Sequence, residues 1–135
     1  MIVVGTGVLF AAADRSDAHH DRCSEFFDDT REALLVPTPV VIETAWLIGS
    51  RLGVDAQATF LSIVSSEIDR VDLTDADWRP VAELVASYRD LDLGVVDAAV
   101  VAVAERMTAK TIATVNPRDF RVVRPAHCDA FELVP

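Results

Sequence analysis

Short apolar runs alternate along this chain with longer stretches whose apolar residues recur at helical spacing. The runs at residues 2–4, 34–36 and 112–115 are too short for helices and are typical of buried strands. Helical stretches lie between them, and strand–helix–strand units of this kind join parallel strands through right-handed crossovers. The sequence therefore predicts an α/β fold, a three-layer α/β/α arrangement around a central, mainly parallel sheet.

Helices are expected to begin near Ser16, Thr38, Asp55, Trp78 and Val95. Thr38, which precedes a proline, and Asp55 are the expected N-caps of their helices. Thr74 and Asp77 form a capping-box pattern ahead of the helix at Trp78, with Asp in place of the usual Glu. The apolar run that starts at Val95 has strand-like β-branched residues, but its length and its alanines favour a buried helix.

Three further strand candidates are weaker: a segment near Val71, Val122–Val123, and Phe131–Val134. In the helix that Asp55 opens, Phe60, Ile63 and Val64 are expected to face inward. In the helix at Trp78, an amphipathic stripe is expected to face the core: Trp78, Val81, Ala82, Val85 and Tyr88.

The composition bounds the class of protein. A chain of 135 residues that is 51% hydrophobic can bury a core of its own, so residues 1–135 are expected to form one domain. No apolar run reaches the ~18–20 residues of a membrane helix, and the N-terminus lacks the pattern of a secretion signal, so a cytoplasmic protein is expected. Cys23 and Cys128 have no partner at metal-ligand spacing and are expected to be reduced packing residues.

The net charge of −10 is unevenly distributed. Residues 1–105 hold 19 acids and 7 bases, whereas residues 106–135 hold 3 acids and 5 bases. Acidic surface repels nucleic acid, so such a partner would approach through the C-terminal third or through bound cations. The simpler interpretation is an acidic surface that keeps the protein in solution.

Two carboxylates interrupt runs that are otherwise apolar. Glu43 is the only charge in residues 40–48, and Asp97 is the only charge in residues 93–101. Each acid could simply favour the N-terminal end of its helix through the helix dipole. However, an unpaired buried carboxylate is costly, and no Arg or Lys lies within four residues of either one.

Two such acids on helices packed against one sheet can converge on a hard divalent cation. Mg²⁺ is the natural candidate, with Mn²⁺ as a substitute, because both accept oxygen ligands. A site of this kind suits phosphodiester hydrolysis, in which the metal activates a water and holds a phosphate oxygen. In a parallel sheet the site lies at the strand carboxyl ends, here near residues 5–6 and 115–119.

Five segments carry a resemblance to a known family. They are an apolar strand followed by Gly5-Thr6-Gly7, then residues 11–20, 38–44, 91–106 and 112–120. The segment at 91–106, LDLGVVDAAVVAVAER, is the most specific of them. On these segments, which span nearly the whole chain, the sequence resembles the PIN domains of the VapC toxin family. The resemblance implies a PIN fold, Mg²⁺-dependent endoribonuclease activity, a homodimer, and inhibition by a cognate VapB-type antitoxin.

The resemblance places the family's four acids at positions 5, 43, 97 and 116, with Glu43 and Asp97 as retained metal ligands. Gly5 stands where the family has its first Asp, and Asn116 stands at the fourth acid. An Asn oxygen can still ligate a hard cation, and Asp119, three residues on, is a possible substitute. The expected consequence is a folded protein with little or no nuclease activity.

Position 5 also has other interpretations. Gly5-Thr6-Gly7 could begin a phosphate-binding loop, but the third Gly of GxGxxG is absent because Phe10 stands there. A glycine that ends a strand is also an ordinary turn residue. We favour the loss of a carboxylate, by drift, by selection against a toxic product or by deliberate substitution.

Other residues have lesser expected roles. Thr6 is expected to point its hydroxyl into the site, or to stabilise a turn. Arg118, Arg121 and Arg124 could bind RNA phosphates or be ordinary surface cations. Two further groups are expected to be mainly structural: the histidines His19 and His20, and the core or dimer-interface aromatics Trp46, Trp78 and Tyr88. Two rival functions remain: a non-catalytic module that binds antitoxin or RNA without cleaving it, and a nucleotide-binding α/β protein.

Overall fold

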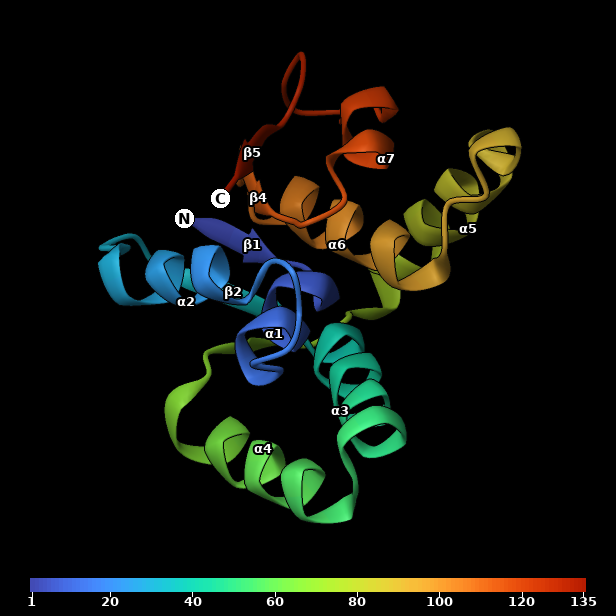
Figure 1. The fold of residues 1–135 in the computed structure, drawn as a ribbon. Helices are drawn as coiled ribbons and strands as arrows, with labels where there is room; N and C mark the ends of the chain where they lie inside the picture. The colour runs from blue at the N-terminus through green and yellow to red at the C-terminus, as the bar shows by residue number, and fades with distance from the viewer.

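The computed structural model describes residues 1–135 and has a five-stranded sheet at its centre (Figure 1). The strands are β1 (Ile2–Val4), β2 (Leu34–Pro37), β3 (Arg70–Val71), β4 (Thr111–Ala113) and β5 (Glu132–Val134). They are ordered β3-β2-β1-β4-β5, and every neighbouring pair is parallel. The predicted parallel α/β fold is therefore confirmed, including weak strands near residue 71 and at the C-terminus.

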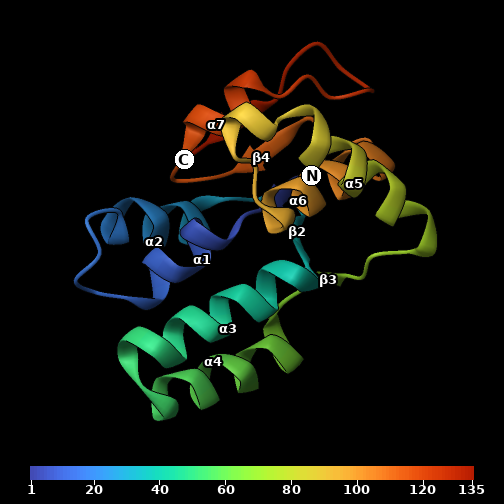
Figure 2. The same cartoon turned by 90° about the vertical axis from the view of Figure 1, so that its right-hand side faces the viewer.

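Seven helices surround the sheet. They are α1 (Thr6–Ala13), α2 (His20–Asp29), α3 (Thr38–Leu52), α4 (Val54–Glu67), α5 (Trp78–Ser87), α6 (Val95–Arg106) and α7 (Pro117–Val122). Helices α1 and α2 lie on one side of the sheet and α5 and α6 on the other, while α4 packs against α3 (Figures 1 and 2). None of these helices combines the length and the apolar character needed to cross a membrane.

Helix α6 lies at the centre of the hydrophobic core. All residues from Ala98 to Ala104 are buried, which confirms the helical interpretation of this β-branched run. Four of these seven residues are alanines, and their small side chains allow α6 to approach β1 and β2 closely. A helix that is buried on all sides shows no amphipathic stripe, so the length of the apolar run indicated a helix better than its periodicity did.

Helix α1 was not predicted. Its sequence, TGVLFAAA, is apolar in nearly every position, so it lacks the periodicity that identifies a surface helix. Helix α2 begins at His20 and not near Ser16, because Asp14 and Asp17 form a polar turn first. The Ser16 amide and hydroxyl donate to Asp14, and the His19 amide donates to Asp17.

Several local expectations were wrong. Val122–Val123 is the end of α7 and not a strand. Thr38 lies inside α3, whose N-cap is Pro37, and its hydroxyl donates to Asp72. Gly53 and not Asp55 is the N-cap of α4, with a φ of 99° that favours glycine.

The expected apolar stripes were only partly correct. Val81 of α5 is buried, but Trp78 is 57% exposed and Val85 is 38% exposed. Ile63 of α4 is also exposed. These helices are at the periphery of the fold, so each buries only a narrow strip of its apolar face.

The predicted capping box at Thr74 and Asp77 is present. Asp77 also connects this segment to helix α6. Asp77 is 3% exposed, accepts the Thr74 amide at 2.8 Å and pairs with Arg106 Nε at 3.0 Å. Burial raises the pKa of Asp77, but the hydrogen bonds from Thr74 and Arg106 outweigh it and hold the pKa below its ordinary value. Arg106 also donates to the carbonyl of Asp72, which ties the 72–77 segment to α6.

Candidate active site

The carboxyl ends of β1 and β4 open into a cavity of about 320 Å³. Its lining includes six predicted or adjacent site positions: Gly5, Thr6, Glu43, Asp97, Thr114 and Asn116. Strand β1 lies between β2 and β4, so the chain leaves β1 toward β2 and later returns on its other side. Ligand sites of open parallel sheets lie at such a reversal of strand order, because the flanking loops diverge there.

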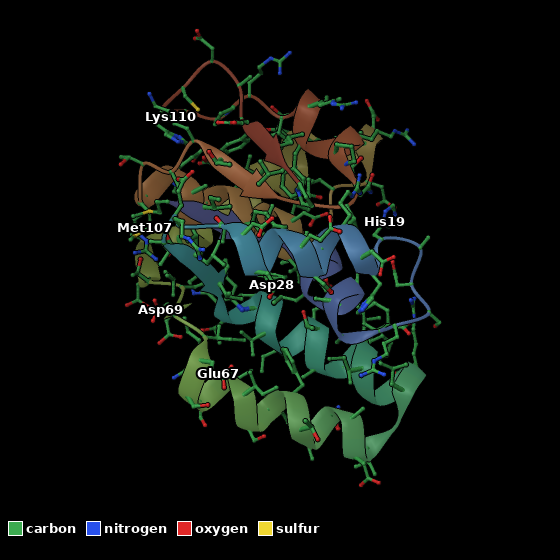
Figure 3. The ribbon with its side chains drawn as sticks, turned by 60° about the vertical axis from the view of Figure 1, so that its left-hand side comes forward. His19, Asp28, Glu67, Asp69, Met107 and Lys110 are labelled. Atoms are coloured by element: carbon green, nitrogen blue, oxygen red, sulfur yellow. The ribbon has the colours of Figure 1, made fainter.

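Four different elements carry the site residues. Gly5 and Thr6 follow β1 and begin α1, whereas Asn116 follows β4. Glu43 lies in the second turn of α3, and Asp97 lies in the first turn of α6, which Gly94 caps. Asp69 and Lys110 precede β3 and β4 and so mark the opposite edge of the sheet, where the strands begin; Figure 3 shows both on one side of the molecule and His19 on the other.

Asp97 is the most strongly perturbed acid of the site. Burial, together with the nearby charges of Glu43 and Asp119, raises its pKa to about 6. No Arg or Lys forms an ion pair with either Glu43 or Asp97. The two lone acids of the sequence therefore meet in one cavity, and neither is neutralised by a cationic side chain.

Two buried hydroxyls near these acids have no hydrogen-bond partner. Thr6 Oγ1, in the cavity wall, and Thr44 Oγ1, next to Glu43 on α3, are both unpaired. An unsatisfied buried hydroxyl costs about 1–3 kcal/mol, so a ligand oxygen that pairs with Thr6 would stabilise the site. Thr114 was not singled out in the sequence, yet its hydroxyl accepts the Asn116 amide at 3.0 Å and shapes the loop after β4.

The predicted site residues that line the cavity bring only oxygen donors to it. Glu43 and Asp97 provide carboxylates, Thr6 provides a hydroxyl, and Asn116 provides an amide oxygen. The chain has no group of three or more His, Cys, Asp or Glu side chains placed to hold a metal ion. Mg²⁺ keeps several waters and often binds through only one or two carboxylates, so the residues present fit this cation.

Gly5 has no conformational need to be a glycine. Its φ of −90° and ψ of 166° are extended values that any L-residue adopts, so the turn interpretation is wrong for this position. A Cβ at Gly5 would lie 3.1 Å from the Ala113 carbonyl oxygen, a tight contact that requires a small shift of the backbone. At Gly7 the same atom would lie 2.4 Å from Val115 Cγ2, so Gly7 is the glycine that close packing requires.

The remaining predicted site residues lie outside the cavity lining. Asp119 does not line it, although its charge acts on Asp97. The α7 residues Arg118 and Arg121, and Arg124 just after that helix, are exposed. The two histidines have local roles: His20 Nδ1 bonds to the Ala11 carbonyl at 2.8 Å, and His19 precedes α2.

Arg51 is a cavity residue that the sequence reasoning missed. It shares the cavity wall with Leu47 and Phe10, and its guanidinium lies 5.1 Å above the Phe10 ring. The signal was present in the sequence, because positions 43, 47 and 51 are spaced by four and share one face of α3. The sequence alone did not single out Arg51, because the expected ligands on this helix face were acids.

A wide apolar groove of about 960 Å³ adjoins the cavity and shares Glu43 with it. Its exposed apolar side chains include Ile42 at 62%, Trp46 at 65% and Trp78 at 57%. Neither tryptophan belongs to the core, which leaves an interface as their expected role. Asp72 adds a second acid to the groove.

The raised pKa of Asp97 predicts that the free energy of unfolding of the metal-free protein depends on pH. The folded carboxyl titrates near 6 and the unfolded one near 3.8, so stability is lost as pH rises between these values and stays lost above them. Asp97→Asn should therefore raise the free energy of unfolding by about 1–3 kcal/mol at pH 8 and change it little at pH 4. Urea unfolding in EDTA measures this, with the exposed Asp90→Asn as control. Equal effects of Asp97→Asn at both pH values would contradict the assignment.

Comparison with known proteins identifies the family of the chain and supports its fold. The PIN domain family matches residues 2–124. The chain is 31% identical to Ribonuclease VapC26 of Mycobacterium tuberculosis, over 99% of this chain and 100% of that protein. Among solved structures, it is similar to VapC20 of Mycobacterium tuberculosis, a sarcin-ricin loop cleaving toxin, at a TM-score of 0.78 and 20% identity over 83% of this chain and 87% of the other.

A second solved structure is the VapBC2 complex of Rickettsia felis bound to a DNA fragment from its promoter. It superimposes at a TM-score of 0.72 and 17% identity over 100% of both chains. At such identities the two structures support the fold, and the family match and the curated relative place the chain more closely. The chain belongs to the PIN domain family, among the VapC-type ribonucleases.

Proposed function

We propose that this protein is a Mg²⁺-dependent endoribonuclease toxin whose own sequence leaves it catalytically impaired. The observation that carries the proposal is the meeting of Glu43 and Asp97, unpaired, in the cavity at the β1 and β4 carboxyl ends. The identity to a curated ribonuclease over nearly the whole chain supports RNA as the substrate class.

In the proposed mechanism the chain's residues prepare a strongly negative, partly water-excluded site. Asp97, with a pKa of about 6, is mostly ionised at neutral pH and together with Glu43 would hold the cation. Bound Mg²⁺ would supply an activated water and polarise a phosphate oxygen. The unpaired Thr6 hydroxyl is free to hydrogen-bond a substrate oxygen, and Asn116 offers a neutral fourth oxygen ligand.

Gly5 is the proposed cause of the impairment. It lines the same cavity but provides no side chain, and its extended backbone would accept an aspartate. We propose that an acid at this position completes the ligand set in active relatives. Without it, repulsion among the acids is smaller, and so is the affinity for the cation.

Restoring that acid is the direct test of function. Gly5→Asp should raise Mg²⁺-dependent cleavage of single-stranded RNA by at least ~10²-fold, the usual scale of a lost electrostatic or acid–base contribution. Gly5→Asn, which adds nearly the same volume at the same contact with Ala113, should stay inactive. Cleavage is followed on gels with and without EDTA. A folded Gly5→Asp protein that fails to cleave would contradict the proposal.

Metal binding is predicted separately from catalysis. At about tenfold excess over Kd, Mg²⁺ or Mn²⁺ should raise the unfolding temperature by about 3–5 °C, equivalent to about 1.4 kcal/mol. Glu43→Ala or Asp97→Ala should abolish this increase, whereas Asp90→Ala should preserve it. An increase that persists in both site variants would place the cation elsewhere.

A non-catalytic binding module is the second candidate function. The absence of a three-acid cluster favours it, because Gly5 and Asn116 replace two of the acids that the resemblance implies. Such a module would bind RNA or an antitoxin with no gain of cleavage in Gly5→Asp. Arg118, Arg121 and Arg124 are proposed to bind RNA phosphates in either case, because they are exposed cations beside the loop that carries Asn116.

We further propose that the apolar groove beside the site receives a segment of a VapB-type antitoxin. The complex of Rickettsia felis VapBC2 supports a partner of this kind. The groove contains Glu43 and Asp72, and the chain carries a charge of −10, so a basic amphipathic segment complements it better than an acidic one does. A segment bound there reaches Glu43 and would obstruct the site.

Trp46→Ser tests this surface. It should prevent a co-expressed cognate antitoxin from co-purifying with the protein, because a 65% exposed tryptophan at the groove would be a binding hot spot. Val54→Ser, at a 72% exposed apolar residue at the start of α4, is the matched control and should retain the complex. If both variants still co-purify with the antitoxin, the groove is not its binding site. Homodimer formation, implied by the resemblance, stays a prediction for sedimentation measurements.

A further inference from the structure

Arg51 occupies an unusual place in the wall of the acidic cavity. It lies in the last turn of α3, two helical turns beyond Glu43 on the same face. Its side chain is exposed at the cavity, and its guanidinium lies 5.1 Å above the buried ring of Phe10. Phe10 belongs to α1, so the Arg51 guanidinium packs on a side chain of α1.

The guanidinium of Arg51 has no partner of its own. It forms no ion pair within 4.0 Å and donates no hydrogen bond. It does not compensate Asp97, whose pKa stays raised by burial and by neighbouring acids alone. The charge of Arg51 lowers the pKa of Asp14, but this carboxylate already accepts two hydrogen bonds from Ser16. The five N–H donors of Arg51 are therefore available to a ligand.

Residues of several elements line the cavity. Arg51 and Leu47 of α3 share a face of that helix with Glu43, Phe10 belongs to α1, and Asn116 and Phe120 belong to the segment around α7. Arg51 is the one cation among the lining residues, and α7 carries further arginines that are exposed. A polyanion bound at the acids would thus have positive charge near it on α3 and on α7.

We propose that Arg51 binds a phosphate of the RNA strand next to the phosphate that is cleaved, on the α3 side of the site. This inference rests on the proposed function. A planar guanidinium can hold two phosphate oxygens at once, and the contact with the Phe10 ring restricts its motion, which lowers the entropy lost on binding. Arg51 thereby sets the direction in which the strand crosses Glu43 and Asp97.

A purely structural role for Arg51 has different consequences. A cation in the last turn of a helix gains about 0.3–1 kcal/mol from the helix dipole, and the stacking of an exposed guanidinium on an aromatic ring adds about 0.5–1 kcal/mol. Such a role would change the unfolding temperature of the protein but not the salt dependence of RNA binding. The salt dependence counts the phosphates that a protein neutralises, so it separates the two roles.

The test measures binding of a fluorescein-labelled single-stranded RNA of mixed sequence, in Mg²⁺, between about 50 and 200 mM salt. The protein with Gly5 in place is used, so that the RNA stays intact. Arg51→Gln should weaken binding roughly tenfold and reduce the slope of log K against log salt by about 0.7, the value for one phosphate on a single strand. Arg51→Lys should retain the slope but bind more weakly than the unaltered protein, because it loses the planar fork.

Arg31→Gln is the matched control. It removes the same charge from an exposed position that precedes β2, at the opposite edge of the sheet from the cavity, and should leave both affinity and slope unchanged. Arg51→Gln in the Gly5→Asp background should also raise KM for RNA more than it lowers kcat.

Each outcome is decisive. If Arg51→Gln and Arg31→Gln bind alike, or if KM is unchanged in an active Gly5→Asp background, the inference is overturned while the proposed function stands. If the unaltered protein binds no RNA and Gly5→Asp is inert, the proposed function falls and the inference falls with it.

Discussion

The parallel direction of all five strands is the constraint on which the rest of this structure depends. Because neighbouring strands run the same way, their carboxyl ends meet at one edge, and every connection must return across a face of the sheet. Those returns become the helices, and their first turns gather above the same edge. Glu43 and Asp97, separated by more than fifty residues in the sequence, reach one cavity for this reason.

The site that results is costly to the protein that carries it. Asp97 is buried beside other acids without a cationic partner, so its charged form is disfavoured and its pKa rises to about 6. An acid in such a position opposes folding at neutral pH unless a cation compensates it. Under the proposed function, the glycine at position 5 reduces this repulsion and also leaves the cation with one ligand fewer. At this position, therefore, the change that stabilises the metal-free protein is also the change that weakens metal binding.

Much of the fold and part of the site were predictable from the sequence. Short apolar strands and long helical stretches differ in period, which is a local property, so the α/β class and most helices were found. Helix α1 was missed because an element buried on nearly all sides shows no period. Trp78 was expected inside but is exposed, because periodicity identifies an apolar face without showing what covers it. Arg51 could not be found in this way, because an arginine near the end of a helix is an ordinary surface residue and its sequence neighbours show no local anomaly.

The sequence by itself determined the parallel α/β class, the two isolated carboxylates and the glycine at position 5, because these are local patterns of polarity and residue type. Only the tertiary structure decided that the carboxylates share a cavity without a cationic partner, that Gly5 has an ordinary extended backbone, and that Arg51 lies over Phe10 without an ion-pair partner. These facts depend on the order of strands and on the packing of distant helices, and no window of sequence contains both partners of a long-range contact.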